Sequence, residues 1–315
     1  MALGLCVVGS GGIASAHADA FAHANDVRRR WVVSRRAEAA ERFRAEWAFE
    51  RSGVALDDAF ADDAVDVVLI ASPNQVHAEQ ATQALEAGKD VIVEIPVALG
   101  IADCERLGTL ARDVGKRVFV CHTMRSFPAI RELRTRVRNG SVDVTQVLGF
   151  FAIPRRSNEG WSGTRSWTDS LLWHHACHQV DASLWVLGLE SVEDVTACFG
   201  RSHPIHGMVI DLSLTFRSVS GQVMTHGLTY NTDELVWELR FVTNQGLLTF
   251  RNGGLFDQSG QTVVPVVSVR DVSRQDHAIL GAIESGRPSE FDLEQVIPSM
   301  RVLDLAARSS EIVVA

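Results

Sequence analysis

The sequence feature that most constrains the fold is a glycine-rich turn near the start of the chain, within LGLCVVGSGGIASAHADAF. A short apolar run precedes the turn and a helical pattern follows it, and Gly9, Gly11 and Ala14 fit the pattern G-x-G-x-x-[GA]. Glycines there permit a tight turn and let a pyrophosphate approach the backbone at the helix N-terminus. The motif is weak by itself, but its strand–turn–helix setting predicts a dinucleotide site. The predicted contacts at this turn are Gly9, Gly11, Gly12 and Ile13.

Strand-like and helical segments alternate through the first part of the chain. After the first strand, runs that read as strands lie at 31–36, 65–73, 90–96 and 117–122, with helical stretches such as 77–88 between them. This alternation implies right-handed βαβ crossovers and a parallel sheet covered on both faces. We therefore expect an α/β fold class, with a doubly wound Rossmann domain over residues 1–122.

Beyond residue 123 the pattern changes to closely spaced strands. Strand-like runs lie at 144–153, 192–199, 208–217, 221–230, 235–243 and 246–251, and the helical segment SLLWHHACHQVDASLWVLG lies among them. Such a series reads as a meander and predicts a mostly antiparallel sheet. We expect an α+β domain over residues 123–315, which is helical again at 273–311. Whether this last helical segment packs back onto the first domain is left open by the sequence.

Net charge, hydropathy and cysteine content exclude several classes of protein. The formal net charge of −9 argues against nonspecific nucleic-acid binding. No apolar run is long enough to span a membrane, and the N-terminus enters a strand without a signal peptide, so we expect a cytoplasmic protein with no membrane contact. The five cysteines are scattered without a CxxC pair and indicate reduced thiols, neither a disulfide framework nor a thiolate zinc site.

The end of the second predicted strand distinguishes between the two nicotinamide cofactors. An NAD site needs a carboxylate there to accept a hydrogen bond from the ribose 2′-hydroxyl. This strand ends in Ser34, Arg35 and Arg36, and no carboxylate follows before Glu38. A hydroxyl and two guanidinium groups suit a 2′-phosphate, although arginines on a surface are often merely solvated. We predict NADP as the cofactor, with NAD as the weaker alternative.

A longer segment carries a family resemblance. The stretch that starts at Val65, VDVVLIASPNQVHAEQATQALEAGKDVIVEIPVA, resembles the glucose-fructose oxidoreductase / inositol dehydrogenase / rhizopine catabolism family, with its TPNxxH-like turn followed by ALEAGKHVxxEKP. The resemblance extends over nearly the whole chain. It implies a Rossmann domain followed by an α+β domain with a large open sheet. It also implies that Ser72, Asn74 and His77 line the nicotinamide-ribose side of the cofactor. Glu94 would lie near the nicotinamide.

Two departures from the family pattern concern the catalytic groups. The lysine of EKP is replaced by Ile95, and the family motif DxGxHxxD aligns with HHACHQVD, which begins at His174 and keeps the histidine as His178. In an α-helix these two histidines share a face with Asp181 and Trp185, opposite a core face. Because the family has a catalytic histidine at this point, the resemblance implies that His178 is the general base. His174 is then its partner or a substrate-binding group.

Other readings of the histidine pair remain open. Histidines four positions apart can bind zinc, but the nearby sequence has no HExxH motif, carboxylate trio or cysteine pair, so no metal is expected. A structural polar face is the ordinary alternative for an isolated pair. At the level of function, the alternatives are a sugar or cyclitol dehydrogenase that has moved its base and a nucleotide-sensing regulator without turnover.

Basic and aromatic residues gather around the histidines and suggest the kind of substrate. The predicted substrate-binding residues are Arg125, Arg155, Arg156, Arg165, Trp173 and His175, with Trp161 and Trp167 as further aromatic neighbours. A cationic pocket of this kind favours a small anionic substrate. Loss of the lysine suits a hydroxyl that is more acidic than that of a sugar, such as the hydroxyl of a hemiacetal. We also expect a homo-oligomer, a dimer formed through the open sheet.

Overall fold

The chain folds into two compact units. The computed structural model describes residues 2–24, 26–155, 159–160, 163–164, 170–202 and 208–309. Unit 1 comprises residues 1–122, 160–163 and 270–297, and unit 2 comprises residues 123–159, 164–269 and 298–315. The chain therefore builds the sheet of unit 2 and then returns to unit 1 before it ends in unit 2.

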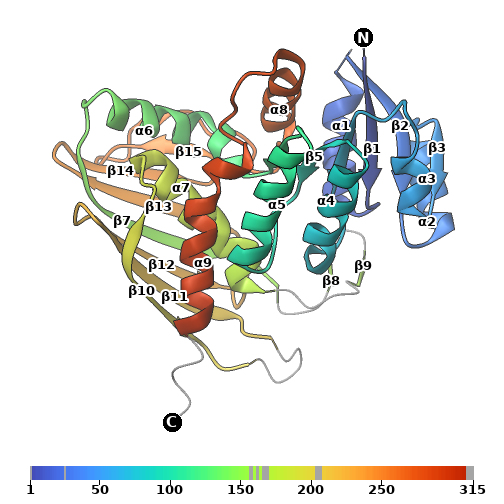
Figure 1. The fold of residues 1–315 in the computed structure, drawn as a ribbon. Coiled ribbons are helices and arrows are strands. Elements are labelled where there is room, and N and C mark those ends of the chain that lie inside the picture. The colour runs from blue at the N-terminus through green and yellow to red at the C-terminus, as the bar shows by residue number, and fades with distance from the viewer. Residues whose placement is uncertain are drawn as a thin grey trace. The chain divides into compact units, whose positions relative to one another are not determined.

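Unit 1 contains a six-stranded parallel sheet in the order β3-β2-β1-β4-β5-β6 (Figure 1). Its strands are β1 (Leu3–Val8), β2 (Val27–Val33), β3 (Arg51–Gly53), β4 (Val67–Ile70), β5 (Asp90–Val93) and β6 (Val118–Val120). Its helices are α1 (Gly12–Ala22), α2 (Ala37–Glu46), α3 (Leu56–Phe60), η1 (Asn74–Val76), α4 (His77–Glu86), α5 (Ile101–Asp113), α8 (Ser273–Ser285) and η4 (Leu293–Gln295). The predicted doubly wound sheet is confirmed.

Two strands of unit 1 differ from the prediction. The second strand covers Val27–Val33 rather than 31–36, because its arginine-rich first half pairs through the backbone while its side chains reach acidic and backbone partners. The short edge strand β3 (Arg51–Gly53) carries no apolar run and was missed. An edge strand needs hydrogen bonds to one neighbour only, so hydrophobic periodicity marks it poorly.

A segment from late in the sequence completes the core of unit 1. Helix α8 packs against α1 and adds Ile279 and Leu280 to the apolar cluster that contains Leu5 and Val7 of β1. Helix α8 is followed by a loop that brings Phe291 into the same cluster. Unit 1 is therefore built from distant parts of the chain.

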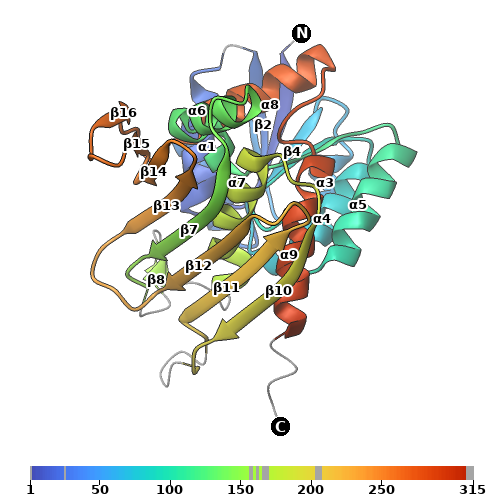
Figure 2. The ribbon, with the colours of Figure 1, turned by 90° about the vertical axis from the view of Figure 1, so that its left-hand side faces the viewer.

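Unit 2 contains an eight-stranded sheet in the order β10-β11-β12-β7-β13-β14-β15-β16 (Figure 2). Its strands are β7 (Val144–Ala152), β10 (Val192–Phe199), β11 (Asp211–Ser218), β12 (Val223–Thr229), β13 (Val236–Thr243), β14 (Gly246–Arg251), β15 (Gly254–Phe256) and β16 (Thr262–Val264), and a separate pair is formed by β8 (Glu159–Gly160) and β9 (Gly163–Thr164). The mostly antiparallel sheet is confirmed. The meander is corrected, because β7 lies between β12 and β13 and pairs with β12 in parallel.

The helices of unit 2 position the histidine-rich segment. They are η2 (Thr123–Ser126), α6 (Pro128–Arg138), the π-helix η3 (Leu171–Ala176), α7 (Cys177–Leu187) and α9 (Ile297–Ser309), whose first residue belongs to unit 1. Helix α7 packs against α6 and against strands β7 and β12, in the middle of the sheet. In neither unit do the described residues include a helix both long and apolar enough to cross a membrane.

Candidate active site

The glycine turn after β1 has the geometry that a pyrophosphate site requires. Gly9 has a φ of +121°, and a Cβ at this position would lie 2.3 Å from the carbonyl oxygen of Ala71, so only glycine fits. Gly11 is the N-cap of α1, and a Cβ there would meet no atom within 4 Å. Gly12 and Ile13 follow as the first residues of the helix. Among the described residues, no side chain caps α1 and none in its first turn is acidic, so its N-terminal amides suit a phosphate.

The loop after β2 presents polar and basic side chains. Ser34 follows the strand directly, and its Oγ lies 2.9 Å from the Oγ of Ser10 in the glycine turn. Arg35 and Arg36 come next and are exposed, and Arg36 is the N-cap of α2. The earlier arginines of this cluster are engaged elsewhere: Arg28 and Arg30 bind Glu50, and Arg29 donates to the carbonyl of Trp47. The three arginines of β2 thus contact Glu50 or a backbone carbonyl, whereas Arg35 and Arg36 lie in the loop after the strand.

The turn after β4 contains three predicted cofactor residues with different environments. The Oγ of Ser72 donates to Gln80 Oε1 at 2.6 Å. Asn74 is buried, and its Oδ1 accepts no hydrogen bond within the described chain, so this atom fits a ribose hydroxyl. His77 is only 1% exposed, and its two ring nitrogens each lie 2.8 Å from a carbonyl oxygen, of Ser72 and of Pro96. We therefore correct the prediction for His77, which joins two loops instead of facing the cofactor.

Glu94, directly after β5, belongs to a buried polar cluster. Its Oε1 lies 2.8 Å from His17 Nε2, and the His17 Nδ1 lies 2.7 Å from Asp276 Oδ2 on α8. Burial opposes the charged form of His17, but the charge of Asp276 and the hydrogen bonds of His17 with Asp276, Cys121 and Glu94 outweigh burial and raise the pKa of His17 well above its usual range. Burial raises the pKa of Asp276, although His17 offsets part of this effect.

The same cluster is the one candidate metal site among the described residues. The possible ligand atoms of His17, Glu94 and Cys121 lie within 4.8 Å of one another. Ligand atoms bound to one tetrahedral zinc at about 2.0–2.3 Å lie roughly 3.3–3.6 Å apart. The 2.8 Å separation of His17 and Glu94 is shorter and matches a hydrogen bond. The geometry accordingly favours a hydrogen-bonded cluster.

The histidine-rich segment begins as a π-helix, which corrects the helical-face argument. A π turn spaces hydrogen bonds five residues apart, so the α-helical relation between positions 174 and 178 does not hold across the junction of η3 with α7. The expected core face is not separate either. From Leu171 to Val186 every residue is buried except three that are half-buried. These three are Trp173, His174 and His178.

The three histidines have distinct neighbours in unit 2. The ring of His174 stacks on that of His175, with centroids 4.3 Å apart. His175 is buried, and its Nδ1 lies 2.7 Å from the hydroxyl of Tyr230. The ring of His178 lies against Trp237, with centroids 5.2 Å apart. Of these three histidines, His174 and His178 are therefore the two that are partly exposed.

The predicted substrate arginines do not form one group. Arg125 is 1% exposed, and its Nε and Nη2 donate to the two carboxylate oxygens of Asp181 at 2.8 and 2.5 Å. We therefore assign Arg125 to holding α7, in place of the predicted substrate contact. Arg155 is half-buried and lies over the ring of Tyr230, 5.3 Å from its centroid. The predicted residues Arg156, Trp161, Arg165 and Trp167 lie outside the described residues.

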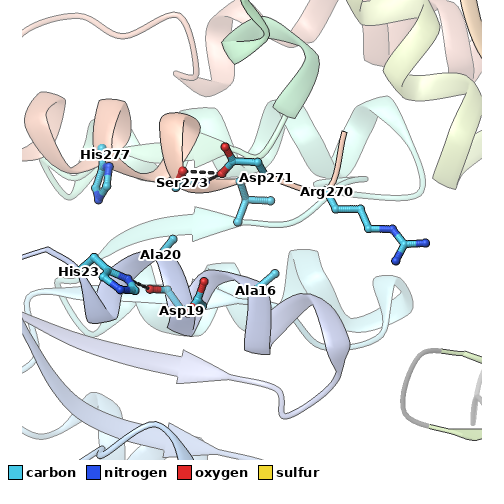
Figure 3. A pocket seen from close by; sticks show the side chains of 9 residues that line it. Ala16, Asp19, Ala20, His23, Arg270, Asp271, Ser273 and His277 are labelled. Carbon is cyan, nitrogen blue, oxygen red and sulfur yellow. Dashed lines mark hydrogen bonds between the residues drawn. The ribbon is translucent and has the colours of Figure 1, made fainter. Parts of the chain in front are cut away.

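A surface hollow of about 330 Å³ lies elsewhere in unit 1, between α1 and the start of α8 (Figure 3). Asp19 of α1 and His23, which follows the helix, line one side of it, and Asp271, Ser273 and His277 line the other. Asp271 accepts hydrogen bonds from the backbone amide and the hydroxyl of Ser273, the first residue of α8. No predicted site residue lines this hollow, so it does not coincide with the dinucleotide site.

Comparison with known proteins agrees with this geometry. The profile described as "Oxidoreductase family, NAD-binding Rossmann fold" matches residues 3–122, and the one described as "Bacterial oxidoreductases, C-terminal" matches residues 128–270. A 4-carboxy-2-hydroxymuconate-6-semialdehyde dehydrogenase from Sphingobium sp. (strain NBRC 103272 / SYK-6) is 32% identical over 304 residues, which are 95% of this chain and 96% of that protein. The chain belongs to the Gfo/Idh/MocA oxidoreductase family.

Solved structures show that the family fold extends over the whole chain. A levoglucosan dehydrogenase in complex with NADH and L-sorbose has a TM-score of 0.87 at 19% identity, and covers 99% of this chain and 97% of its own. GenD2 from gentamicin A biosynthesis, in complex with NAD, has a TM-score of 0.85 at 21% identity and covers 99% and 95%. The chain is thus a Gfo/Idh/MocA oxidoreductase with an NAD(P)-binding Rossmann fold.

Sequence reasoning missed three residues of this oxidoreductase's candidate site. Tyr230 is the only tyrosine in the chain, and it links His175 to Arg155. Its position at the end of a strand-like run was the only available signal. His17 and Asp276 are 259 positions apart, and no local pattern joins them.

Proposed function

We propose that this enzyme uses NADP⁺ to oxidise the cyclic hemiacetal of 4-carboxy-2-hydroxymuconate-6-semialdehyde to 2-pyrone-4,6-dicarboxylate. The observation that carries the proposal is the full-length similarity to the Sphingobium dehydrogenase of that substrate. The replacement of the family lysine by Ile95 supports it. A hemiacetal hydroxyl is more acidic than a sugar hydroxyl and needs less activation from a neighbouring cation.

In this reaction the hydroxyl-bearing carbon loses a hydride and its oxygen loses a proton, which leaves the lactone carbonyl. NADP⁺, when bound, supplies the hydride acceptor. We assign the proton to His178, a half-buried imidazole that lies against the ring of Trp237. A group with a pKa near the working pH is the most effective general base, and histidine satisfies this condition. His174, also half-buried, would hydrogen-bond the substrate or His178.

The substrate is a dicarboxylate, and the proposal needs cationic or donor groups beside the histidines. Arg155, Tyr230 and His175 form a contiguous set in unit 2, through the Arg155–Tyr230 ring contact and the Tyr230–His175 hydrogen bond. We propose that Arg155 binds a substrate carboxylate. Arg156 and Arg165 remain proposed contacts on the strength of the sequence.

The choice of NADP over NAD depends on the loop after β2. Ser34 stands where an NAD site places a carboxylate, and Arg35 and Arg36 extend from the same loop as exposed cations. Guanidinium groups bind phosphate through charge-assisted, often bidentate hydrogen bonds. We infer that these residues read the 2′-phosphate.

The test is turnover of a panel that contains the semialdehyde, myo-inositol and glucose. Each substrate is assayed with NADP and with NAD, and the absorbance of the reduced nicotinamide measures the rate. We expect oxidation of the semialdehyde with NADP and negligible rates with myo-inositol or glucose. Turnover of the polyols alone would make the enzyme a sugar or cyclitol dehydrogenase. Cofactor binding without turnover of any candidate would favour a nucleotide-sensing regulator.

We further propose that the enzyme dimerises through the open face of the eight-stranded sheet. Leu148 and Phe150 of the central strand β7 are 39% and 45% exposed. Their register partners on β12, Thr225 and Gly227, are half-buried. Adjacent large apolar side chains on a solvent-facing sheet are typical of an interface. Light scattering on the purified protein measures the assembly.

A further inference from the structure

Three buried side chains in unit 1 form a hydrogen-bonded series with one accessible end. Asp276 and His17 are fully buried, whereas the side chain of Glu94 is 12% exposed. At the inner end, Asp276 Oδ1 also accepts from Gln275 Nε2 at 3.2 Å. At the outer end, Glu94 Oε2 accepts from the backbone amide of Ile95 at 3.1 Å. Each carboxylate oxygen and each imidazole nitrogen of the series therefore has a hydrogen-bond partner.

The number of protons in the series determines its charge. Each of the two carboxylate–imidazole contacts, at 2.7 and 2.8 Å, needs one hydrogen between nitrogen and oxygen. An imidazolium between two carboxylates provides both hydrogens, and so does a neutral imidazole beside one protonated carboxyl group. Either arrangement leaves Asp276, His17 and Glu94 with one net negative charge. Their hydrogen bonds can redistribute the proton without changing this total.

The accessible end lies at the edge of the sheet where a dinucleotide binds. Strands β1, β4 and β5 are parallel neighbours, so the glycine turn after β1 and Glu94 after β5 are at the same edge. Ligands of doubly wound sheets bind outside the carboxyl ends of the strands. Asp276 lies in the first turn of α8, where the helix dipole favours a negative group.

We propose that Asp276 and His17 are positioning residues that hold Glu94 as the anionic end of this series, and that the series favours the oxidised, positively charged nicotinamide over the neutral reduced ring. This inference rests on the placement of Glu94 near the nicotinamide, which the family resemblance implies. A fixed negative charge lowers the free energy of a nearby cation and leaves a neutral ring almost unaffected. The enzyme should therefore bind NADP⁺ more tightly, relative to NADPH, than it would without the series.

The test is the ratio of the dissociation constants of NADPH and NADP⁺, measured by calorimetry without substrate. Glu94→Gln removes the carboxylate at the accessible end and Asp276→Asn removes the inner carboxylate, each while keeping the side-chain shape. We expect Glu94→Gln to lower the ratio by roughly 3- to 30-fold, mainly through weaker binding of NADP⁺. Asp276→Asn should lower it by less, because Glu94 keeps its carboxylate but loses the group that holds it through His17. Asp62→Asn is the matched control, because Asp62 is a hydrogen-bonded carboxylate in the loop before β4, at the opposite edge of the same sheet. Its ratio should equal that of the wild type.

Several outcomes would overturn the proposal. An Asp276→Asn protein that unfolds at a lower temperature but keeps the wild-type ratio would make the series purely structural. An equal shift in Asp62→Asn would show a general charge effect. Stoichiometric binding of added zinc, abolished by His17→Gln, would replace the series by a metal site. If Asp276→Asn does not fold, Glu94→Gln at the exposed end still decides the question. Because no substrate is present, a wrong substrate assignment would leave all these results unchanged.

Discussion

The buried ion pair between Arg125 and Asp181 gives the sharpest prediction for unit 2. Both side chains are 2% exposed, and Ser299 of α9 adds a hydrogen bond of 3.2 Å to Asp181 Oδ1. Asp181 lies on α7, three residues after His178, and its carboxylate thus joins α7 to η2 and α9. We expect Arg125→Met to destabilise the fold because the carboxylate of Asp181 would remain buried without its cation.

The magnitude follows from the burial of the pair. Removing one partner of a buried ion pair costs about 3–5 kcal/mol. For a domain of this size, about 2–4 °C of melting temperature corresponds to each kcal/mol, so the transition of unit 2 should fall by roughly 6–20 °C. Removing both charges in Arg125→Met/Asp181→Leu should recover most of this loss, since no unpaired charge remains. Thermal and urea unfolding followed by circular dichroism would give the four corners of the double-mutant cycle.

Arg155→Met is the matched control, since its guanidinium is half-buried over Tyr230 and has the proposed substrate role. It should raise KM for the dicarboxylate with little change in melting temperature. The reasoning about Arg125 fails if Arg125→Met keeps the wild-type melting temperature and instead raises KM. Arg125 would then be the substrate contact that the sequence predicted.

Four further predictions concern the catalytic base, the cofactor, acid stability and assembly. His178→Asn should lower turnover by about 10²–10⁴ while NADP still binds, and a variant with the wild-type rate and pH profile would remove His178 from the mechanism. Replacing Arg35 and Arg36 together by alanine should weaken NADP by about 1–3 kcal/mol and leave NAD unchanged in titrations, whereas equal losses would show that neither arginine reads the 2′-phosphate. Burial lowers the pKa of His226 from 6.5 to about 3. Between these pH values the unfolded chain binds a proton that the native state does not, so the free energy of unfolding falls by about 1.4 kcal/mol per pH unit as the pH drops. Denaturant titrations at several pH values should show that His226→Gln removes this slope. Phe150→Asp should give monomers by light scattering with an unchanged melting profile, and an unchanged mass would place the interface elsewhere.

Sequence alone was sufficient wherever the deciding interactions are local. The strand, glycine turn and helix from Leu3 to Ala22 follow from an apolar run, a glycine at positive φ and a helical pattern. The same holds for the strands of unit 2, whose alternating apolar residues mark one buried face. Neighbouring residues fix these features, since backbone conformation and amphipathic period act over a few positions.

Tertiary structure decided the pairings and the roles of buried charges. The parallel contact of β12 with β7 joins segments separated by the whole histidine-rich region. Asp276 contacts His17, which is 259 positions away in the sequence. Arg125 binds Asp181, 56 positions away, instead of making the predicted substrate contact. A charged side chain looks the same in sequence whether it faces water or another charge. Its role is set by desolvation, which penalises an isolated buried charge and therefore selects the partner that the fold brings within hydrogen-bonding distance.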